Sequence, residues 1–454
     1  MLDTNVEALR PEIMLVLSAF DCENENFTHY FSSSGGKFYN SIEYNGEFFD
    51  FEEENKAEDE LVFKRLAKRS CKLAFYKVLS KIKGYNLPWG ALTGIRPTKL
   101  AYTEIASGGS FEKLFDDMCV SPSNTQLVKR VLQAQKGLYE KGGQDLYISL
   151  PFCPTKCEYC SFITAPIEKT KIYVEKYVDC LIKELESVRP LINNLRSIYI
   201  GGGTPFVLDN SLLVKAYMGV NRIFDGKVEY TVEAGRPDVF CEEKLKSARD
   251  FGVNRICVNP QTFNDLTLQK IGRKHTSAQT LEAYAASKKY GFDINLDLIA
   301  GLADETVNDF SYSLDRAIEL DPENITIHTL SLKSGAKLKE GLKRLNVSGI
   351  SDMIALSREK LTSAGYEPYY LYRQKYQAGG LENVGWAKKG KACVYNIDVM
   401  EEITDNIAVG ANAISKRFYG SEDRIERYAA PKDIPTYIEK CEKIIEERNK
   451  LFKD

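Results

Sequence analysis

Short runs rich in β-branched and aromatic residues alternate with amphipathic stretches over the middle of the chain. We predict strands at 145–151, 197–203, 229–235, 255–261, 293–300 and 324–332. Amphipathic segments that predict helices lie between them, at 172–189, 210–224, 241–251, 277–291 and 307–320. Repeated strand–helix units build a parallel sheet, either open or rolled into a barrel. Because about six units fall short of a complete eight-stranded barrel, the sequence predicts an α/β protein with an incomplete barrel or an open sheet.

Polar residues and glycines stand at or just beyond the carboxyl ends of the predicted strands. Gly201 to Gly203 end the second run, Glu233 lies in the third, Gln261 ends the fourth and Asp297 lies in the fifth. Parallel sheets and barrels bind their ligands at this end of their strands. We therefore expect one composite site assembled from successive strands.

Residues 1–140 have a different pattern and predict a separate α+β unit. We predict strands at 13–20 and 38–51. The second of these contains Asn45-Gly46, and both residues tolerate the positive φ of a two-residue hairpin turn. Residues 61–83 repeat apolar side chains at helical spacing, which predicts a long helix.

That predicted helix carries a basic face. Its basic side chains are Lys64, Arg65, Lys68, Arg69, Lys72, Lys77, Lys81 and Lys83. A solvated helix surface explains such a pattern, and an anionic partner or ligand is the alternative explanation.

The strand–helix rhythm ends after residue 335. Residues 351–366 predict a helix, and a tyrosine-rich stretch follows up to Tyr376. The chain ends in a predicted helix at 433–450 that is rich in Lys and Glu. We therefore place domain boundaries that give three parts, 1–140, 145–335 and 336–454.

Composition excludes several classes of function. The 454 residues are 43% hydrophobic and 28% charged, as in a globular protein with a large core. A net charge of −3 argues against a general nucleic-acid binder. No run approaches the roughly 18 apolar residues that span a bilayer, and Ile13 to Phe20 is too short for a secretory signal. The 11 cysteines are an odd number, so we expect no disulfide framework and a reduced, cytoplasmic protein.

Three cysteines follow the first predicted strand of the repeat. Cys153, Cys157 and Cys160 form a C-x3-C-x2-C loop. Three thiolates on a short loop can hold an iron–sulfur cube and leave its fourth iron without a protein ligand. A structural zinc site is the alternative, but zinc takes a fourth ligand, and neither Cys180 nor a histidine lies close in the sequence.

This loop resembles that of the radical S-adenosylmethionine (SAM) superfamily, in which an aromatic residue, here Tyr159, precedes the last cysteine. The resemblance implies a [4Fe–4S] cluster whose open iron is chelated by the amino and carboxylate groups of SAM. One electron from the cluster then cleaves SAM, and the resulting 5′-deoxyadenosyl radical abstracts hydrogen from a substrate. The protein binds and orients these groups, whose chemistry is the cofactor's.

Further phrases resemble the oxygen-independent coproporphyrinogen III oxidase (coproporphyrinogen dehydrogenase) family over roughly residues 145–420. They are Tyr147 to Cys153 (YISLPFC), GGGTP at 201–205, Val232-Glu233-Ala234, RICVNPQTF at 255–263, Ile271-Gly272-Arg273, LDLIAGL at 296–302 and GANAIS at 410–415. The N-terminal phrase LTGIRPTK at 92–99 resembles the HemZ-type branch. The family fold implied is a partial (β/α)6 radical SAM barrel with an N-terminal extension and a C-terminal cap.

The resemblance also implies which residues contact SAM. These residues are Tyr147, Phe152, Gly202, Gly203, Thr204, Glu233, Gln261, Arg273 and Asp297. Asp297 suits a ribose hydroxyl, because a carboxylate inside an apolar strand is costly unless it is paired or ligand-bound. Arg273 suits the SAM carboxylate, with a surface salt bridge as its alternative. For the glycines, the alternative is a tight turn.

The reaction implied is the oxidative decarboxylation of two propionates of coproporphyrinogen III to vinyl groups, which gives protoporphyrinogen IX in haem biosynthesis. Cations that could hold the substrate carboxylates are Arg236, Lys274, Arg373 and Lys375, each of which is alternatively a surface residue. A one-electron donor such as flavodoxin or ferredoxin would reduce the cluster. Neither nucleic acid nor a membrane span is expected.

One position departs from the dehydrogenase pattern. That branch carries a fourth cysteine two residues after the third, where this chain has Phe162. The position is closer to the HemW-like haem-chaperone branch, whereas the N-terminal extension favours the dehydrogenase. A haem-binding relative and a radical SAM enzyme acting on another tetrapyrrole therefore stay open as alternatives.

Overall fold

The computed structural model describes residues 1–94, 96–160, 164–331, 347–374, 380–420 and 424–453. The described chain forms two compact units. The first contains Met1–Arg130 and Leu371–Glu382, and the second contains Val131–Tyr370 and Asn383–Asp454. The first boundary thus lies near the predicted end of the N-terminal part, whereas residues 371–382 of the predicted C-terminal part return to the first unit.

The first unit contains a mixed sheet in the order β1-β2-β3-β4. These strands are β1 (Leu2–Thr4), β2 (Phe27–Ser34), β3 (Lys37–Tyr44) and β4 (Glu47–Glu54). Asn45 and Gly46 join β3 to β4 with φ values of 52° and 83°, as a two-residue hairpin turn requires. The predicted hairpin is therefore confirmed.

The strand predicted at 13–20 is wrong, because this segment belongs to helix α1 (Arg10–Ala19). Its buried residues Ile13, Val16 and Leu17 follow helical spacing and lie on one face. A short apolar run does not distinguish a buried strand from a buried helix. Pro11 in the first turn was the signal that favoured a helix.

The long basic helix is confirmed as α2 (Glu60–Lys83). It begins at Asp59, whose side chain accepts a hydrogen bond from the Val62 amide, and ends at Gly84 with φ 74°. The helices that follow are α3 (Pro97–Ala106), α4 (Phe111–Asp117) and α5 (Pro122–Ala134).

The second unit is built on the predicted parallel repeat. Its strands β5, β8, β9, β10, β11 and β12 are neighbours in chain order and pair in parallel. They comprise Gln144–Leu150, Leu195–Gly202, Glu229–Gly235, Arg255–Gln261, Asp293–Ala300 and Asn324–Thr329. Each predicted strand is thus confirmed to within a few residues, and the six strand–helix units form a partial (β/α)6 barrel.

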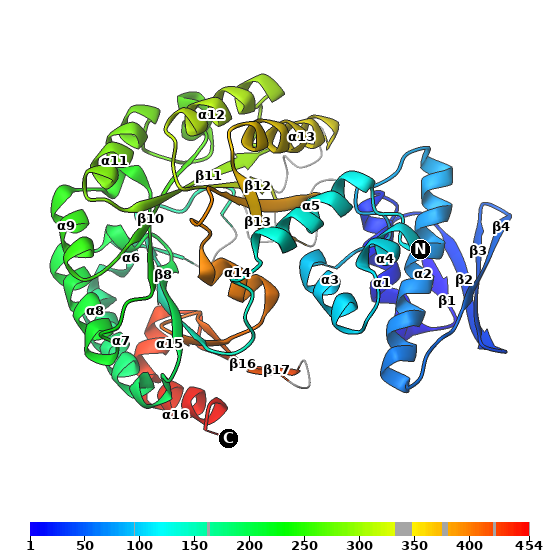
Figure 1. Cartoon of the computed structure of the whole chain (residues 1–454), viewed down its shortest axis with the longest axis horizontal. Helices are drawn as coiled ribbons and strands as arrows, with labels where there is room; N and C mark the ends of the chain where they lie inside the picture. The colour runs from blue at the N-terminus through cyan, green and yellow to red at the C-terminus, as the bar shows by residue number, and fades with distance from the viewer. Residues whose placement is uncertain (95, 161–163, 332–346, 375–379, 421–423, 454) are drawn as a thin grey trace. The chain divides into compact units, whose positions relative to one another are not determined.

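The intervening helices cover the convex side of this curved sheet (Figure 1). The predicted helices are confirmed as α7 (Val174–Val188), α8 (Asn210–Ile223), α9 (Glu242–Asp250), α11 (Ser277–Lys289) and α12 (Val307–Glu319). The short helices α6 (Ile167–Thr170) and α10 (Asp265–Lys270) precede α7 and α11. Among the helices of the described ranges, none is long and apolar enough to cross a membrane.

The C-terminal region, expected to form a cap, adds strands to both edges of the same sheet. At one edge β14 (Glu382–Ala387) pairs antiparallel with β12. At the other, β15 (Asp405–Val409) pairs in parallel with β5 and leads to the antiparallel strands β16 (Ile414–Tyr419) and β17 (Arg424–Ala429). The remaining elements are α13 (Val347–Ser363), β13 (Glu367–Arg373), α14 (Val394–Glu401), α15 (Ile434–Glu439) and α16 (Cys441–Leu451).

The parallel strands have one apolar face and one polar face, because successive side chains of a strand point to opposite sides. In β11, for example, Ile294, Leu296 and Leu298 alternate with Asn295 and Asp297. Five of the six parallel strands have one partly accessible residue in their middle or carboxyl-terminal half whose two neighbours are buried. These residues are Tyr147, Glu233, Asn259, Asp297 and His328. The polar face is therefore open to solvent at the end of the sheet where a parallel sheet binds ligands.

Candidate active site at the carboxyl ends of the parallel strands

The cysteine loop begins directly after β5 and is anchored to its neighbours by backbone hydrogen bonds. Strand β6 (Phe152–Cys153) pairs in parallel with β7 (Ala165–Pro166). The Thr204 amide, just after β8, donates to the Phe152 carbonyl at 2.7 Å. The Glu158 amide donates to the Ile271 carbonyl at 3.0 Å. The loop is thus fixed between the ends of two strand–helix units.

The three thiols of the loop are a chemically suitable set of iron ligands, although they do not yet form a closed ligand group. Cys157 is buried, and Cys153 and Cys160 are partly buried. Burial raises the pKa of Cys153, while the Thr204 hydroxyl, which donates to its Sγ at 3.6 Å, acts in the opposite direction. Within the described ranges, no three Cys, His, Asp or Glu side chains converge as a metal site. Each thiolate of a [4Fe–4S] cluster binds a different iron, so the three thiols need not converge on one point.

Arg236 links the end of β9 to the cysteine loop. Its Nη1 donates to Oγ1 of Thr155 at 2.5 Å. Its Nε and Nη2 donate to the two carboxylate oxygens of Asp238 at 2.9 and 2.6 Å. The guanidinium is 3% exposed, so its charge is balanced inside the protein by Asp238.

Tyr159, the aromatic residue of the loop, is held by Arg273. Nη2 and Nε of Arg273 donate to the Tyr159 hydroxyl at 2.6 and 3.2 Å. Arg273 also lies near the carbonyl of Asn259, with Nη1 at 3.4 Å. The surface salt bridge considered as the alternative for Arg273 does not occur in the described part of the chain, because its side chain is buried.

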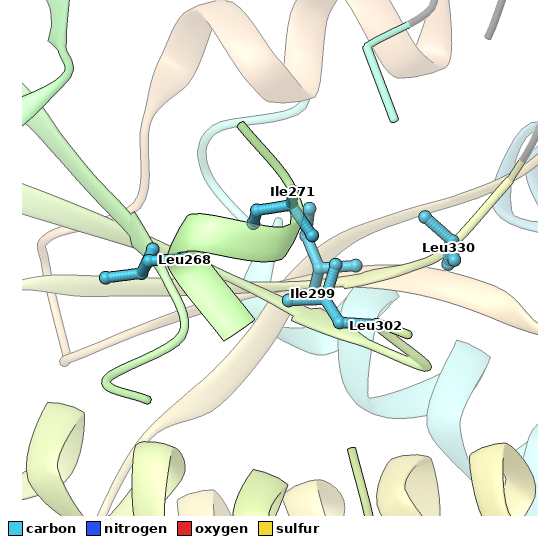
Figure 2. Close-up of a cluster of buried hydrophobic side chains, with 5 residues drawn as sticks. All are labelled: Leu268, Ile271, Ile299, Leu302 and Leu330. Carbon is cyan, nitrogen blue, oxygen red and sulfur yellow. The ribbon is translucent and has the colours of Figure 1, made fainter. Parts of the chain in front are cut away.

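The ring of Tyr159 packs against a small apolar cluster beside the loop. Figure 2 shows the members of this cluster, which are Leu268, Ile271, Ile299, Leu302 and Leu330. They come from α10, the end of β11 and the residue after β12, so the cysteine loop rests on a side-chain layer shared by three strand–helix units.

The glycines after β8 allow close approach of the chain to itself. A Cβ on Gly203 would lie 2.4 Å from the Phe152 carbonyl oxygen, and a Cβ on Gly201 would lie 2.8 Å from Oε2 of Glu233. Gly202 has φ 97°, which favours glycine. Close approach to Phe152 therefore accounts for Gly203, and the positive φ accounts for Gly202. SAM contacts at Gly202, Gly203 and Thr204 stay predictions.

Glu233 of β9 is the carboxylate at the centre of the open end. Its Oε1 accepts a hydrogen bond from the Tyr199 hydroxyl at 2.6 Å. Burial raises the pKa of Glu233 to about 7, whereas the Tyr199 hydrogen bond and the Gly202 amide lower it. Asp297 raises the same pKa and His328 lowers it. The carboxylate is therefore close to its protonation midpoint at neutral pH.

Asp297 of β11 has partners within the protein. Asn295 Nδ2 donates to its Oδ1 at 2.7 Å, and His328 Nε2 lies 3.7 Å from its Oδ2. Although burial acts to raise its pKa, hydrogen bonds and the charge of His328 hold the pKa of Asp297 below the usual value. The Asp297 carboxylate is thus an ionised hydrogen-bond acceptor near the carboxyl ends of the parallel strands.

Two amide side chains of β10 leave polar atoms without a partner. Gln261 has φ 69°, and neither its Oε1 nor Oδ1 of Asn259 has a hydrogen-bond partner among the described residues. A buried unpaired acceptor is costly unless a ligand or water satisfies it. These acceptors therefore fit a ligand with N–H or O–H donors, such as the ribose, adenine or amino group of SAM.

Tyr147 and Phe152 differ in their surroundings. Tyr147 lies on the polar face, with its ring stacked 6.3 Å from that of Tyr199 and 6.2 Å from that of Tyr395. The Phe152 ring is buried on the other side, edge-on to Tyr177 at 5.1 Å. A contact of Phe152 with SAM would therefore involve its backbone.

The cations proposed for substrate binding differ in their surroundings. Lys274 is exposed, and Arg236 is paired with Asp238. Arg373 lies in the first unit, where it donates to the carbonyls of Leu92 and Gly380 and its guanidinium is 5.3 Å from the ring of Trp89. Lys375 and Phe162 lie outside the described residues. Their roles stay predictions.

Comparisons with known proteins identify the family to which this chain belongs. The family model described as "Radical SAM superfamily" matches residues 147–317, which run from β5 into α12. The chain is 37% identical over 409 residues to the "Oxygen-independent coproporphyrinogen-III oxidase-like protein HemZ" of Bacillus subtilis (strain 168). That match covers 85% of this chain and 81% of HemZ. The chain belongs to the HemZ-type family of radical SAM proteins. Membership implies a [4Fe–4S] cluster and SAM.

Other relatives of this radical SAM chain carry a different name. "Heme chaperone HemW" of Lactococcus lactis subsp. lactis (strain IL1403) is 35% identical over 231 residues, which are 49% of this chain and 60% of HemW. The solved structure titled "Coproporphyrinogen III oxidase (HemN) from Escherichia coli is a Radical SAM enzyme" matches with a TM-score of 0.53. It is 21% identical and covers 69% of this chain and 72% of its own, so it supports the fold.

Sequence reasoning missed several residues of this radical SAM site. Tyr199, Asn259 and His328 occupy alternate positions of strands that had been predicted, so strand alternation was the signal that could have found them. Tyr395 comes from α14, far along the chain, and its sequence surroundings carry no signal for this contact.

Proposed function

We propose that this protein is a SAM-dependent coproporphyrinogen dehydrogenase, an oxidoreductase of haem biosynthesis. In that reaction each of two propionates of coproporphyrinogen III loses a hydrogen atom, carbon dioxide and an electron and becomes a vinyl group. The observation that carries the proposal is the extent of the HemZ match, which covers 85% of the chain and so extends beyond the radical SAM core. A match restricted to residues 147–317 would have supported the cofactor alone.

The chain's own residues support the cofactor part of the proposal. Cys153, Cys157 and Cys160 would hold the cluster, and the loop that carries them is fixed by Arg236 and Arg273. When bound, the cluster and SAM would supply the one-electron chemistry that removes hydrogen from the substrate. Partly buried at the same end of the sheet, Glu233 and Asp297 would orient the amino and ribose groups of SAM. Carboxylate acceptors make the stronger class of hydrogen bond, which favours one orientation.

In this proposal Arg273 has two roles, to hold Tyr159 and to bind the SAM carboxylate. Its Nη2 and Nε hold the Tyr159 hydroxyl, while its Nη1 is only weakly engaged, at 3.4 Å from the Asn259 carbonyl. An arginine presents several donors in a fixed fork, so Nη1 could donate to a SAM carboxylate while Nη2 and Nε keep their bonds to Tyr159. SAM binding would then leave the anchor of the cysteine loop intact.

A haem-binding chaperone is the second candidate. Two observations favour it, namely Phe162 at the position of the dehydrogenase branch's fourth cysteine and the similarity to proteins named heme chaperone HemW. A chaperone would bind haem, and it would produce no vinyl group from coproporphyrinogen III. Radical chemistry on another tetrapyrrole is a third possibility, with SAM cleavage that depends on a different substrate.

An anaerobic assay tests the proposal. Iron-loaded protein is given SAM, a reductant and coproporphyrinogen III, and products are read by mass. We expect deoxyadenosine to rise above the substrate-free background and one vinyl group to form for each propionate lost. Haem binding together with substrate-independent deoxyadenosine formation and no vinyl product would favour the chaperone. We also propose a cytoplasmic location and a flavodoxin or ferredoxin as electron donor.

A further inference from the structure

Tyr395 reaches the open end of the parallel sheet from the C-terminal region. Helix α14 begins at residues whose amides are held by Glu229 of β9, with Val394 N at 2.9 Å and Tyr395 N at 3.1 Å from its carboxylate oxygens. Arg255 Nη2 lies 3.4 Å from the same carboxylate. The start of α14 is therefore tied to the strand that carries Glu233. In Figure 1, α14 lies away from the helices on the convex side of the sheet.

The ring of Tyr395 completes an aromatic stack on the polar face of the sheet. Its centroid lies 4.4 Å from that of Tyr199, with an angle of 21° between the rings. On the same face, Tyr147 stacks with both tyrosines. Tyr199 and Tyr395 are each 8% exposed, so both rings are confined. The O–H bond of a tyrosine prefers the plane of its ring, so packing that holds the plane of the Tyr199 ring also directs its hydroxyl hydrogen.

That hydroxyl donates to Glu233 Oε1 at 2.6 Å. We propose that Tyr199, with its ring held by Tyr395, is a positioning residue that orients the Glu233 carboxylate toward the amino group of SAM. The proposal rests on the SAM-binding part of the proposed function and adds a connection from the C-terminal region to the cofactor site.

Other groups also act on Glu233, and they define the expected pH dependence. They are Tyr147 of β5, Tyr199 of β8, Cys257 of β10, Asp297 of β11, His328 of β12 and Tyr395 of α14. Asp297 is the negative charge in this set, and it favours protonation of Glu233, whereas the Tyr199 hydrogen bond favours ionisation. Loss of the hydroxyl would therefore shift the protonation of Glu233 to higher pH.

Three variants separate this role from simple packing. Tyr199→Phe removes the hydroxyl and keeps the ring, Tyr395→Ala removes the stacking partner, and Tyr395→Phe keeps the stacking ring. Tyr217→Phe is a matched control, because Tyr217 is buried and its hydroxyl has no hydrogen-bond partner among the described residues.

SAM affinity is measured at equilibrium on iron-loaded protein from about pH 6 to about pH 9, a range that spans the Glu233 midpoint. For Tyr199→Phe we expect a loss of about fivefold or more at neutral pH and an upward shift of the affinity midpoint by about one pH unit. Tyr395→Ala should change both in the same direction, while Tyr395→Phe and Tyr217→Phe resemble the wild type. Iron content should stay normal in all four.

The outcomes distinguish this proposal from the proposed function. Wild-type affinity and pH dependence in both Tyr199→Phe and Tyr395→Ala, with normal iron content, would overturn the positioning role. Equal losses at every pH in Tyr395→Ala and Tyr395→Phe would also overturn it, since only packing would then be involved. A wild-type protein that binds SAM with the expected pH dependence but forms no vinyl product would overturn the dehydrogenase and leave this proposal standing. Absence of SAM binding by the wild type would overturn both.

Discussion

Arg273 donates two hydrogen bonds to the hydroxyl of Tyr159, at 2.6 and 3.2 Å, and thereby joins the segment after α10 to the end of the cysteine loop, next to Cys160. The sequence predicts a different role for each side chain. Arg273 is expected to bind the SAM carboxylate, and Tyr159 is the aromatic residue before the last cysteine of the loop. If Arg273 binds SAM, as proposed, cofactor binding and loop position share one guanidinium.

Tyr159→Phe tests the strength of this contact. The change removes the acceptor of a charged donor and keeps the ring on its apolar cluster. We expect the free energy of unfolding to fall by about 1.5–3 kcal/mol, the usual contribution of a hydrogen bond to a charged group. Urea unfolding of the iron-free protein measures the change, with Tyr217→Phe as the control whose hydroxyl has no partner in the described ranges. Equal stability of the two variants would contradict the prediction.

The cysteine assignment predicts a sharp difference between cysteines. Alanine at Cys153, Cys157 or Cys160 should abolish the optical and paramagnetic signals of a [4Fe–4S] cluster, together with SAM cleavage. Cys241→Ala is the control, because this thiol is exposed and lies outside the loop, at the start of α9. A full cluster in any single variant of the three loop cysteines would show that the ligand assignment is wrong.

Glu233→Gln predicts a change in how stability depends on pH. The pKa of Glu233 is raised to about 7 in the folded protein from an ordinary value of 4.5, so the folded state binds the extra proton between these values. The stability cost of an ionised Glu233 is therefore absent below about pH 4.5 and complete above about pH 7. The full shift corresponds to about 3 kcal/mol, and water access at this partly buried side chain reduces it to about 1–2 kcal/mol.

Unfolding of the iron-free proteins at low and high pH measures this difference. Glu233→Gln should be more stable than the wild type at about pH 8 and equal to it near pH 4. Asp293→Asn is a matched control on the next strand but one, because its carboxylate is paired with Lys391 at 2.7 Å. A constant difference at all pH values would mean that Glu233 does not carry the pH dependence.

Much of the fold followed from the sequence because the parallel strands are apolar runs with helices between them. The prediction failed at α1, where Ile13, Val16 and Leu17 occur in a run too short to show its period. The partnership of β15 with β5 also could not be predicted, since nothing local in Asp405–Val409 specifies a partner so distant in the chain. Such pairings are decided by which sheet edge is left open.

Candidate site residues could be predicted from the sequence where a residue of that type, at that position in a strand, has few other plausible roles. Glu233, Gln261 and Asp297 were predicted because polar side chains at strand ends of a parallel sheet point to one place, and the structure places them in the carboxyl-terminal halves of β9, β10 and β11. The substrate cations were not predictable in the same way, because arginine and lysine are common on surfaces and in internal ion pairs. Arg373 illustrates this, since backbone carbonyls of the first unit and the ring of Trp89 surround it.

Charge reversal on α2 tests the docking of an acidic electron donor. Lys64 and Lys68 are suitable positions, because their side chains are 63% and 45% exposed. Lys72 is not, since it is 13% exposed and contacts Glu12 and Thr93, so a carboxylate there would disturb the fold. We expect Lys64→Glu with Lys68→Glu to slow turnover with a protein reductant and not with dithionite, because opposite charges steer association.

The matched control for α2 is reversal of two exposed lysines of the second unit, Lys227 and Lys246. Both double variants change the net charge equally, so a general charge effect would slow them alike. A loss of turnover rate that is confined to the α2 variant, and that becomes smaller at high salt, would support docking of the electron donor on α2. Equal turnover rates of the α2 variant with the protein reductant and with dithionite would mean that α2 is a solvated helix surface that binds no electron donor.

Arg236 is the residue whose two possible roles predict opposite results. A substrate carboxylate would need the guanidinium to be available, yet its donors are engaged by Thr155 and by both oxygens of Asp238, and it is 3% exposed. Removal of the side chain would release the cysteine loop at Thr155 and leave the Asp238 carboxylate without its cation. A buried charge that loses its partner costs several kcal/mol.

We therefore expect Arg236→Ala to lower the iron content of the purified protein and its stability, measured by iron analysis and urea unfolding. Arg236→Lys should restore less than half of the loss, because an ammonium group cannot bind Asp238 in the same two-point manner while reaching Thr155. Lys274→Ala, a change at an exposed cation in the same region, should leave the iron content unchanged. Normal iron content in Arg236→Ala, combined with a raised requirement for coproporphyrinogen III, would instead assign Arg236 to the substrate.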